Sequence, residues 1–207
     1  MSVQQIFEYS NSLIDGVSMN FKRYLFSQIR WNTRLIEILG ARGAGKTTLM
    51  LQRAKTLNQA VPNQAVYLSL DDKLMYTYSM IDLAMELEKY GVKYLFLDEV
   101  HKYPAKQKGF DWSAEIKNIY DRLPGLNIVY SGSSVLKIYK GHGDLSRRKS
   151  SYRLAGLSFR EYLVLNDVYT HKEVSLTDIL EQHQEISSTI TGKIKIIPHF
   201  KEYLKNG

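Results

Sequence analysis

The chain has 207 residues, 44% hydrophobic and 24% charged, which suits one globular domain or one domain with a small appendage. It has no cysteine, which excludes disulfides, cysteine-ligated zinc and thiol catalysis and fits a reducing cytoplasm as the expected location. The net charge of +7 suits an anionic partner such as ATP or nucleic acid, but the basic residues are too scattered to establish nucleic-acid binding. No apolar run approaches the length of about 18 residues that a membrane helix needs, and no secretory signal is visible.

Residues 1–33 read as a helical segment that precedes the first strand. Apolar side chains with the spacing of one helix face occur at Ile6, Phe7, Tyr9 and Leu13. Residues 21–29 mix apolar and basic side chains and predict a second, short helix. We expect this segment to pack on the core; a basic arm at a membrane surface is a less favoured alternative.

The central motif is a phosphate-binding loop at residues 40–47, which fits G-x-x-x-x-G-K-[ST]. A buried strand is predicted at 34–39 and a helix from 48 onward, which is the context that this motif requires. Glycines let the backbone turn its N–H groups toward a bound anion at the start of a helix. We expect Lys46 to bridge the β- and γ-phosphates and the Thr47 hydroxyl to ligate Mg²⁺. The predicted nucleotide contacts are Gly40, Ala41, Arg42, Gly43, Ala44, Gly45, Lys46, Thr47 and Thr48.

A second strand is predicted at 65–70, with Asp71 and Asp72 at its carboxyl end. These acids could approach Mg²⁺ or a partner, although solvated loop carboxylates are the more ordinary interpretation. A helix then begins at Ser79, which has capping spacing to Asp82.

The second chemical landmark is an apolar strand that runs into two adjacent acids, Asp98 and Glu99. This is the Walker B pattern, in which Asp98 holds Mg²⁺ through water and Thr47 while Glu99 activates the attacking water. The adjacency indicates the additional-strand, catalytic-glutamate branch of P-loop proteins rather than a small-molecule kinase. Residues 98–101 also spell a D-E-x-H helicase box, but the chain has no room for a second RecA-like domain, so His101 is interpreted as a loop histidine.

A helix at 112–122 and a strand at 126–130 lead to a serine-rich turn. A polar side chain at this strand end would lie beside the γ-phosphate, in the sensor-1 position, and Ser131 and Ser133 are the candidates. The basic, glycine-bearing loop 137–149 follows. In it Arg147 or Arg148 could stabilise transition-state charge, in cis or across a subunit interface, and simple solvated charge is an equal alternative.

The C-terminal part is predicted to contain a strand at 152–157 and then helices. Ser158 and Glu161 have the spacing of a helix-capping pair. Further helices are expected at 175–190 and 196–204.

Taken together, the segments 40–48, 94–104, 131–134, 144–148 and 157–163 resemble those of prokaryotic AAA-type ATP-binding proteins related to archaeal ATPases and STAND NTPases. The likeness extends from about residue 18 to the end. It implies a three-layer α/β P-loop NTPase fold, RecA-like, with a parallel sheet of order 5-1-4-3-2 and short helical N- and C-terminal additions. It also implies that Lys46 and Thr47 are Walker A, Asp98 and Glu99 Walker B, Ser133 or its neighbours sensor 1, and Arg147 or Arg148 arginine sensors.

We therefore expect an N-terminal helical segment at 1–33 that packs on the core, an ATPase core at 34–165 and a C-terminal helical segment at 166–207. Relatives usually continue into a helical and winged-helix-like region, so the resemblance implies that 166–207 begins a truncated lid or effector domain.

The expected function is that of an ATP-binding, Mg²⁺-dependent, ATP-hydrolysing nucleotide switch. The alternatives are a nucleic-acid-dependent ATPase, which would be a motor or a transposition-type regulator, and a non-hydrolysing nucleotide-bound scaffold. Beyond ATP, the sequence leaves a protein partner, DNA and a second copy of the chain open as partners, and no membrane partner is expected. A GTPase and an ABC transporter are disfavoured because the N-K-x-D and L-S-G-G-Q motifs are absent.

Overall fold

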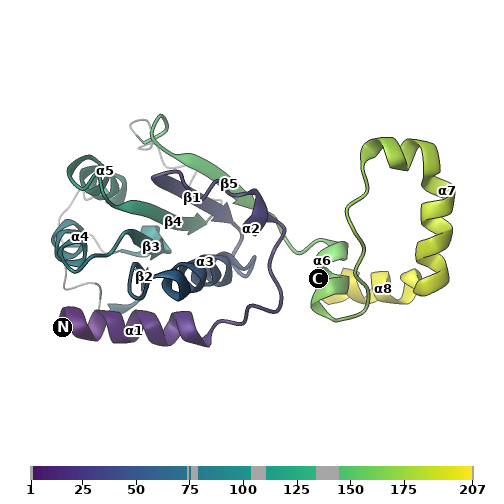
Figure 1. Cartoon of the computed structure of the whole chain (residues 1–207), viewed down its shortest axis with the longest axis horizontal. Coiled ribbons are helices and arrows are strands. Elements are labelled where there is room, and N and C mark those ends of the chain that lie inside the picture. The colour runs from purple at the N-terminus through teal and green to yellow at the C-terminus, as the bar shows by residue number, and fades with distance from the viewer. Residues whose placement is uncertain (1, 74, 76–78, 104–110, 134–144, 207) are drawn as a thin grey trace. The chain divides into compact units, whose positions relative to one another are not determined.

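The computed structural model describes residues 2–73, 75, 79–103, 111–133 and 145–206. The chain divides into two compact units, Met1–Leu154 and Ala155–Gly207 (Figure 1). Helix α6 (Phe159–Leu165) lies in the second of these units.

The first unit is built on a five-stranded sheet in which all neighbouring strands are parallel, in the order β2-β3-β4-β1-β5. This confirms the predicted order, read from the opposite edge. The strands are β1 (Leu35–Gly40), β2 (Ala65–Ser69), β3 (Tyr94–Asp98), β4 (Asn127–Ser133) and β5 (Ser150–Leu154).

Two strand boundaries differ from the prediction because pairing with β1 decides them. β4 continues to Ser133, where a turn was expected, since Gly40 at the end of β1 pairs with Ser133. β5 begins at Ser150 and ends at Leu154, earlier than the predicted 152–157, because its register follows β1 only as far as Gly40.

Helices connect the strands and fill the second unit. Ser79 and Ser158 accept hydrogen bonds from the backbone N–H groups of Asp82 and Glu161, which confirms both predicted helix starts. The helices are α1 (Val3–Gly16), α2 (Leu25–Gln28), α3 (Lys46–Ala60), α4 (Met80–Lys89), the 3₁₀ helix η2 (Val100–Lys102), α5 (Trp112–Arg122), α6 (Phe159–Leu165), α7 (Leu176–Lys193) and α8 (Ile196–Asn206).

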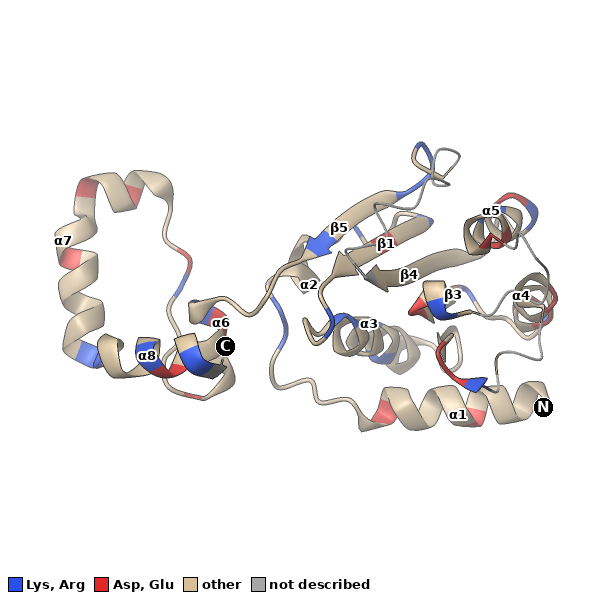
Figure 2. Ribbon diagram, turned by 180° about the vertical axis from the view of Figure 1, so that it is seen from behind, with Lys and Arg blue, Asp and Glu red and all other residues tan. Residues whose placement is uncertain are grey.

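Lysine and arginine positions are spread over helices, strands and loops of both units, and acidic positions are interspersed with them (Figure 2). On α8, for example, Lys205 pairs with Glu202 at 3.3 Å. In the part of the chain that the structure describes, none of the helices combines the length and the apolar character needed to cross a bilayer.

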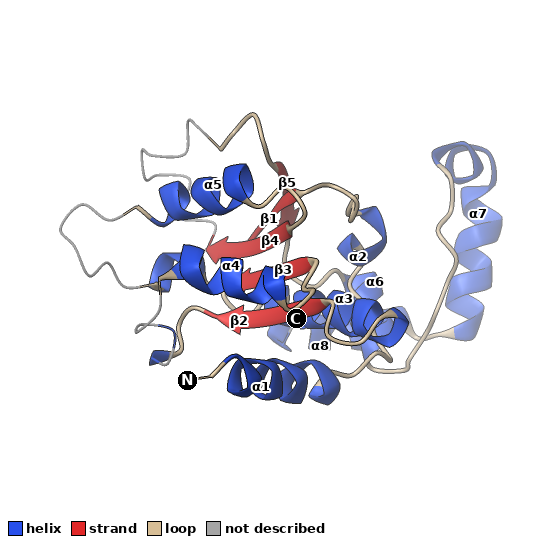
Figure 3. Cartoon of the chain, turned by 60° about the vertical axis from the view of Figure 1, so that its left-hand side comes forward, coloured by secondary structure: helices blue, strands red, loops and turns tan. Residues whose placement is uncertain are grey.

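Helices cover both faces of the sheet, which gives the three-layer architecture (Figure 3). Side chains alternate between the faces along each strand, so each strand contributes to two cores. Leu95 and Leu97 of β3 lie in the core that α4 and α5 complete, whereas Phe96 lies in the core that α3 completes. By the same alternation Asp98 belongs to the α3 face.

Helix α1 covers the edge strand β2, whose outer N–H and C=O groups would otherwise be open to another strand. The buried Ser10 hydroxyl accepts a hydrogen bond from the backbone N–H of Tyr67 at 2.9 Å. Lys55 of α3 donates to the carbonyl oxygens of Asp15, in the last turn of α1, and of Val17, which follows the helix. The N-terminal helix is therefore joined both to the sheet and to the P-loop helix.

An ion pair that is largely buried links β1 to the residue before β5. Glu37 of β1 accepts hydrogen bonds from Lys149 at 2.7 Å, Ser151 at 2.6 Å and Tyr130 at 3.0 Å. Burial alone would raise the pKa of Glu37, but the hydrogen bonds from Lys149 and Ser151, the lysine charge and the Tyr130 hydroxyl outweigh it, so the net pKa is lowered from 4.5.

In the second unit, aromatic rings from α6 and α8 pack together. Phe159 lies 5.2 Å from Phe200 and 5.4 Å from Tyr203, measured between ring centroids. The Tyr203 hydroxyl donates to the Leu157 carbonyl oxygen at 2.6 Å. Helix α7 buries none of its side chains, so these rings supply much of the packing of this unit.

Lys149→Met should lower the free energy of unfolding by about 3 kcal/mol at pH 7, because it leaves the Glu37 carboxylate buried without its counter-charge. The native pair stabilises the protein above the unfolded pKa of Glu37, and this contribution is lost as the pH falls through the lower folded pKa. The difference between wild type and variant should therefore shrink below pH 4.5. Urea unfolding at several pH values measures this difference in the free energy of unfolding. Lys93→Met, at an exposed lysine, is the control. An equal loss for both variants would contradict this explanation.

Candidate functional site

The candidate site lies at the carboxyl edge of the sheet, where parallel strands commonly bind ligands. The register pairs Asp98 with Ser69 of β2. Alternation along the strands puts Tyr67, Asp98 and Ser131 on the face that α3 covers. The start of α3 therefore meets polar side chains from three neighbouring strands.

The loop from β1 to α3 needs glycine at defined positions. Gly43 and Gly45 have φ of +79° and +93°, a conformation that other residues adopt at a cost. At Gly40 a Cβ atom would come within 2.6 Å of the Leu154 carbonyl oxygen of β5. Two glycines of the motif thus allow the turn, and the third leaves room for the backbone of the neighbouring strand β5.

Lys46 begins α3 and is 5% exposed. Its Nζ donates to the carbonyl oxygens of Gly40 at 3.1 Å and Ala41 at 3.0 Å. From the outside of the loop, the buried Arg23 donates to the Ala44 carbonyl oxygen. The loop is thus held from both sides by cationic side chains.

Asp98, 2% exposed, is hydrogen-bonded through both carboxylate oxygens. Oδ2 accepts from the hydroxyls of Thr47 at 2.5 Å and Tyr67 at 2.7 Å. Oδ1 accepts from the Ser131 hydroxyl and from the backbone N–H of Glu99 at 3.1 Å. Burial, the charge of Asp98 and the hydrogen bond to it raise the pKa of Tyr67, so this phenol stays protonated as a donor.

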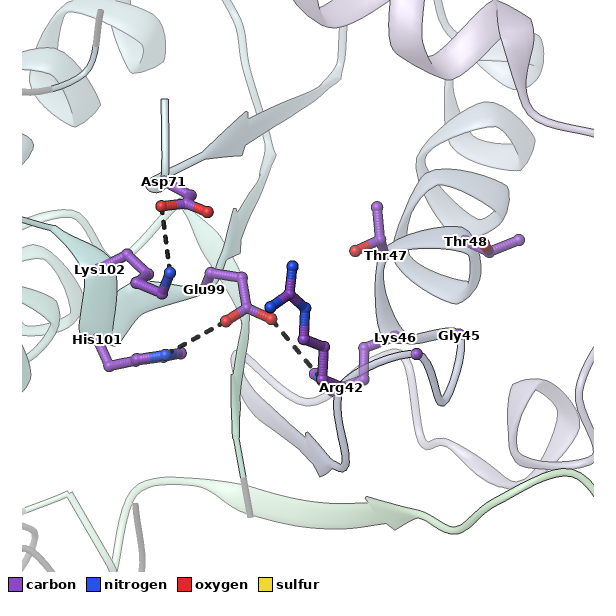
Figure 4. A pocket seen from close by; sticks show the side chains of 10 residues that line it. Arg42, Gly45, Lys46, Thr47, Thr48, Asp71, Glu99, His101 and Lys102 are labelled. Atoms are coloured by element: carbon purple, nitrogen blue, oxygen red, sulfur yellow. Dashed lines mark hydrogen bonds and ion pairs between the residues drawn. The ribbon is translucent and has the colours of Figure 1, made fainter. Parts of the chain in front are cut away.

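Glu99 follows in the left-handed region, with φ of 55° and ψ of 46°, which is uncommon for a residue other than glycine. Its carboxylate lies between the side chains of Lys46 and His101 (Figure 4). Oε1 is 3.8 Å from Lys46 Nζ, and Oε2 is 3.3 Å from His101 Nε2.

These side chains surround a cavity of about 470 Å³. Its lining is polar and carries both signs of charge, with the loop and the start of α3 on one side and the end of β3 and η2 on the other (Figure 4). The lining residues are Arg42, Gly43, Gly45, Lys46, Thr47, Thr48, Asp71, Glu99, His101 and Lys102. A glycine-rich loop at the start of a helix, with cationic side chains beside it, is suited to bind a polyanion such as a nucleoside triphosphate.

The oxygen donors fit Mg²⁺, which prefers oxygen ligands and keeps several waters. Thr47 lines the cavity, and its hydroxyl proton is directed to Asp98, which leaves the hydroxyl oxygen available to a cation. Among the described residues there is no cluster of three or more His, Cys, Asp or Glu that could hold a metal by themselves. Thr47 and, through water, Asp98 would hold the ion together with the nucleotide.

The structure brings most of the predicted site residues together but leaves two apart. The loop residues, Thr47, Asp98 and Glu99 meet at the carboxyl edge. Arg147 and Arg148 precede the first residue of β5 and so lie at the opposite, amino edge. At about 3.3 Å per strand residue this is roughly 15 Å from the loop. Arg148 pairs there with Asp121 at 3.4 Å, and Arg147 is exposed.

Of the two serine candidates, Ser131 is the one whose side chain the structure describes, and it bonds to Asp98. It also accepts from the backbone N–H of Glu99 at 3.0 Å. Ser133 ends β4 opposite Gly40, and its side chain lies outside the described residues.

Sequence reasoning missed several contributors to the site. His101, interpreted as a loop histidine, lies in η2 and lines the cavity against Glu99. Tyr67, which lies in the predicted strand 65–70 and was given no role in the site, donates to Asp98. Asp71, for which a role at the site and a solvated loop carboxylate were both left open, lines the cavity, stays largely exposed and pairs with Lys102 at 3.4 Å. The D-E-x-H spelling was the one signal that pointed to His101.

The family model described as an AAA domain matches residues 32–163, more than half of the chain. The chain belongs to the AAA domain family. This AAA domain has no match among curated proteins. Its family supports an ATP-binding, ATPase-type function.

Solved structures with which the AAA domain aligns are larger than this chain. C. elegans PCH-2 is 16% identical with a TM-score of 0.45, over 84% of this chain and 49% of PCH-2. AMPPCP-bound DnaA from Aquifex aeolicus is 16% identical with a TM-score of 0.44, over 96% of this chain and 58% of DnaA. The S. cerevisiae Hsp104–ADP complex is 20% identical with a TM-score of 0.42, over 78% of this chain and 23% of Hsp104. The chain thus spans less than two thirds of each.

Proposed function

We propose that this AAA domain binds ATP with Mg²⁺ at the carboxyl edge of the sheet, hydrolyses it and acts as a nucleotide-dependent switch. One observation carries the proposal. Lys46, Thr47 and Glu99 line one cavity, and the buried Asp98 behind it accepts the Thr47 hydroxyl proton. Nucleotide-binding and water-activating groups are thereby within reach of one triphosphate.

In the proposed reaction a water attacks the γ-phosphorus in line with the bond to ADP that breaks. Glu99 accepts a proton from this water, and inorganic phosphate is released. Lys46 leaves the loop carbonyl oxygens to which it donates here and offsets charge on the phosphate oxygens. Thr47 and, through water, Asp98 would hold Mg²⁺, which would supply further positive charge beside the phosphates.

The switch role follows from competition for Lys46. Its Nζ lies 3.8 Å from Glu99 in this structure, and a bound triphosphate would compete with Glu99 for the same ammonium group. Glu99 directly precedes η2, so a change in its partners acts on that turn and on Lys102, which donates its backbone N–H to the Glu99 carbonyl oxygen. We propose that nucleotide state is transmitted by this route.

Arg147 and Arg148 are proposed to serve the site of a second copy of the chain. They lie at the amino edge of the sheet, so they cannot reach the phosphates of their own chain without unpairing β5. An arginine supplied in trans is an established way to stabilise the charge of phosphoryl transfer. A homo-oligomer is therefore the partner arrangement that we favour.

Two other functions lead to different measurements. A nucleic-acid-dependent ATPase would show hydrolysis that duplex DNA stimulates and that salt suppresses steeply. A nucleotide-bound scaffold would bind ATP without turnover, in wild type and in Glu99 variants alike. The spread of basic positions over both units favours neither.

Glu99→Gln should keep ATP affinity within about threefold and lower kcat by about 10²-fold or more, because it removes the base and keeps the shape. Lys46→Ala should lose tight nucleotide binding. Steady-state hydrolysis and titration with a fluorescent ATP analogue measure the two effects, with Glu86→Gln, an exposed residue of α4, as the control. Normal ATP affinity in Lys46→Ala would contradict the site, and undiminished turnover in Glu99→Gln would contradict the role of Glu99.

The variant with both Arg147 and Arg148 changed to Ala should bind ATP normally but hydrolyse it at least about tenfold more slowly. Mixing it with Lys46→Ala should restore part of the activity, because one chain then supplies the arginines and the other the intact loop. Arg122→Ala, at the exposed end of α5, is the control. Full activity of the double variant alone, or no recovery on mixing, would contradict a role in trans.

A further inference from the structure

His101 is one of the cavity-lining residues that the proposed reaction does not use. Its Nε2 lies 3.3 Å from Oε2 of Glu99 (Figure 4). A carboxylate only accepts hydrogen bonds, so a hydrogen bond along this contact requires the proton to be on Nε2. The other ring nitrogen, Nδ1, is buried and has no hydrogen-bond partner among the described residues. Glu99 is thus the polar partner that the structure gives this ring.

The backbone fixes this contact. Glu99 has left-handed φ and ψ, which turns the chain sharply after β3 and into η2. The turn is closed by hydrogen bonds from the Lys102 N–H to the Glu99 carbonyl at 2.8 Å and from the Tyr103 N–H to the Val100 carbonyl at 3.3 Å. Val100 between them is fully buried. The left-handed backbone of Glu99 thus turns the chain so that the side chain of His101, two residues later, lies against the Glu99 carboxylate.

The two oxygens of Glu99 face different partners. Oε1 faces Lys46, and Oε2 faces His101. When Lys46 pairs with phosphate oxygens, Glu99 loses its contact with Lys46 and keeps its contact with His101. Without it the carboxylate could rotate toward the cationic side chains of the lining, which include Arg42.

We propose that His101 is a positioning residue: its Nε2–H holds Oε2 of Glu99, so that Oε1 stays directed at the water beside the γ-phosphate. This inference rests on the proposed function. His101 touches neither nucleotide nor water in this role and acts through Glu99 alone. It should therefore affect turnover and leave nucleotide affinity unchanged.

The test compares substitutions that differ in where they place a donor. The amide nitrogen of Gln can occupy the position of Nε2, whereas the amide of Asn is one bond too short. His101→Gln should keep kcat within about threefold, and His101→Asn and His101→Ala should lower it by about tenfold or more, since small misplacements of a reacting group are costly. The dissociation constant of ATP should change by less than about twofold in all three. In a Glu99→Gln background, His101→Ala should cause no further loss.

A second measurement reports on the contact without turnover. The chain has five histidines, so imidazole ¹H–¹⁵N correlation spectra of the nucleotide-free protein are tractable. His101, assigned from the signals lost in His101→Gln, should show a protonated Nε2, and Glu99→Gln should shift its signals and leave those of the other histidines in place.

The outcomes separate the two proposals. A wild type that neither binds nor hydrolyses ATP would overturn the proposed function and this inference with it. An active wild type with unchanged kcat in His101→Ala, equal kcat in the Gln and Asn variants, or His101 signals that ignore Glu99→Gln would overturn only the role of His101.

Discussion

The hydrogen bonds that the buried carboxylate of Asp98 accepts are the interaction on which the site depends. They join β3 to the start of α3 through Thr47, to β2 through Tyr67 and to β4 through Ser131. The burial of a charged group is costly unless hydrogen bonds replace its contacts with water. Both carboxylate oxygens of Asp98 accept such hydrogen bonds. The position of the P-loop helix relative to the sheet is thereby fixed by the residue that is expected to organise the metal.

The parallel sheet places constraints on everything around this carboxylate. All strands end at one edge, so loops that follow strands meet there and segments that precede strands are kept at the other. Glu99 and the P-loop belong to the first group, and Arg147 belongs to the second. A single chain of this topology brings Glu99 to the P-loop by itself, whereas the role proposed for these arginines requires a second copy.

The loop and the elements around it could be predicted because their signals are local, whereas the strand order was implied by the family resemblance. A buried strand, a glycine-rich turn and a helix follow one another in sequence, and Asp98 with Glu99 ends an unmistakably apolar strand. The contribution of Tyr67 could not be predicted, because it depends on the register between β2 and β3. Whether Arg147 lies at the amino or the carboxyl edge of the sheet depends on where β5 begins, which its pairing with β1 decides. The contact of His101 depends on the left-handed backbone of Glu99, which no residue pattern indicates.

The most direct measurement is calorimetric titration of ATP, with Mg²⁺ and with a chelator, into wild type and Asp98→Asn. The substitution keeps the shape of the side chain and removes its charge. Wild type should bind ATP at least about tenfold more tightly with Mg²⁺, and Asp98→Asn should lose most of this difference while it still binds metal-free ATP. Absence of saturable ATP binding by the wild type, or an undiminished Mg²⁺ effect in Asp98→Asn, would contradict a nucleotide–metal site organised by Asp98.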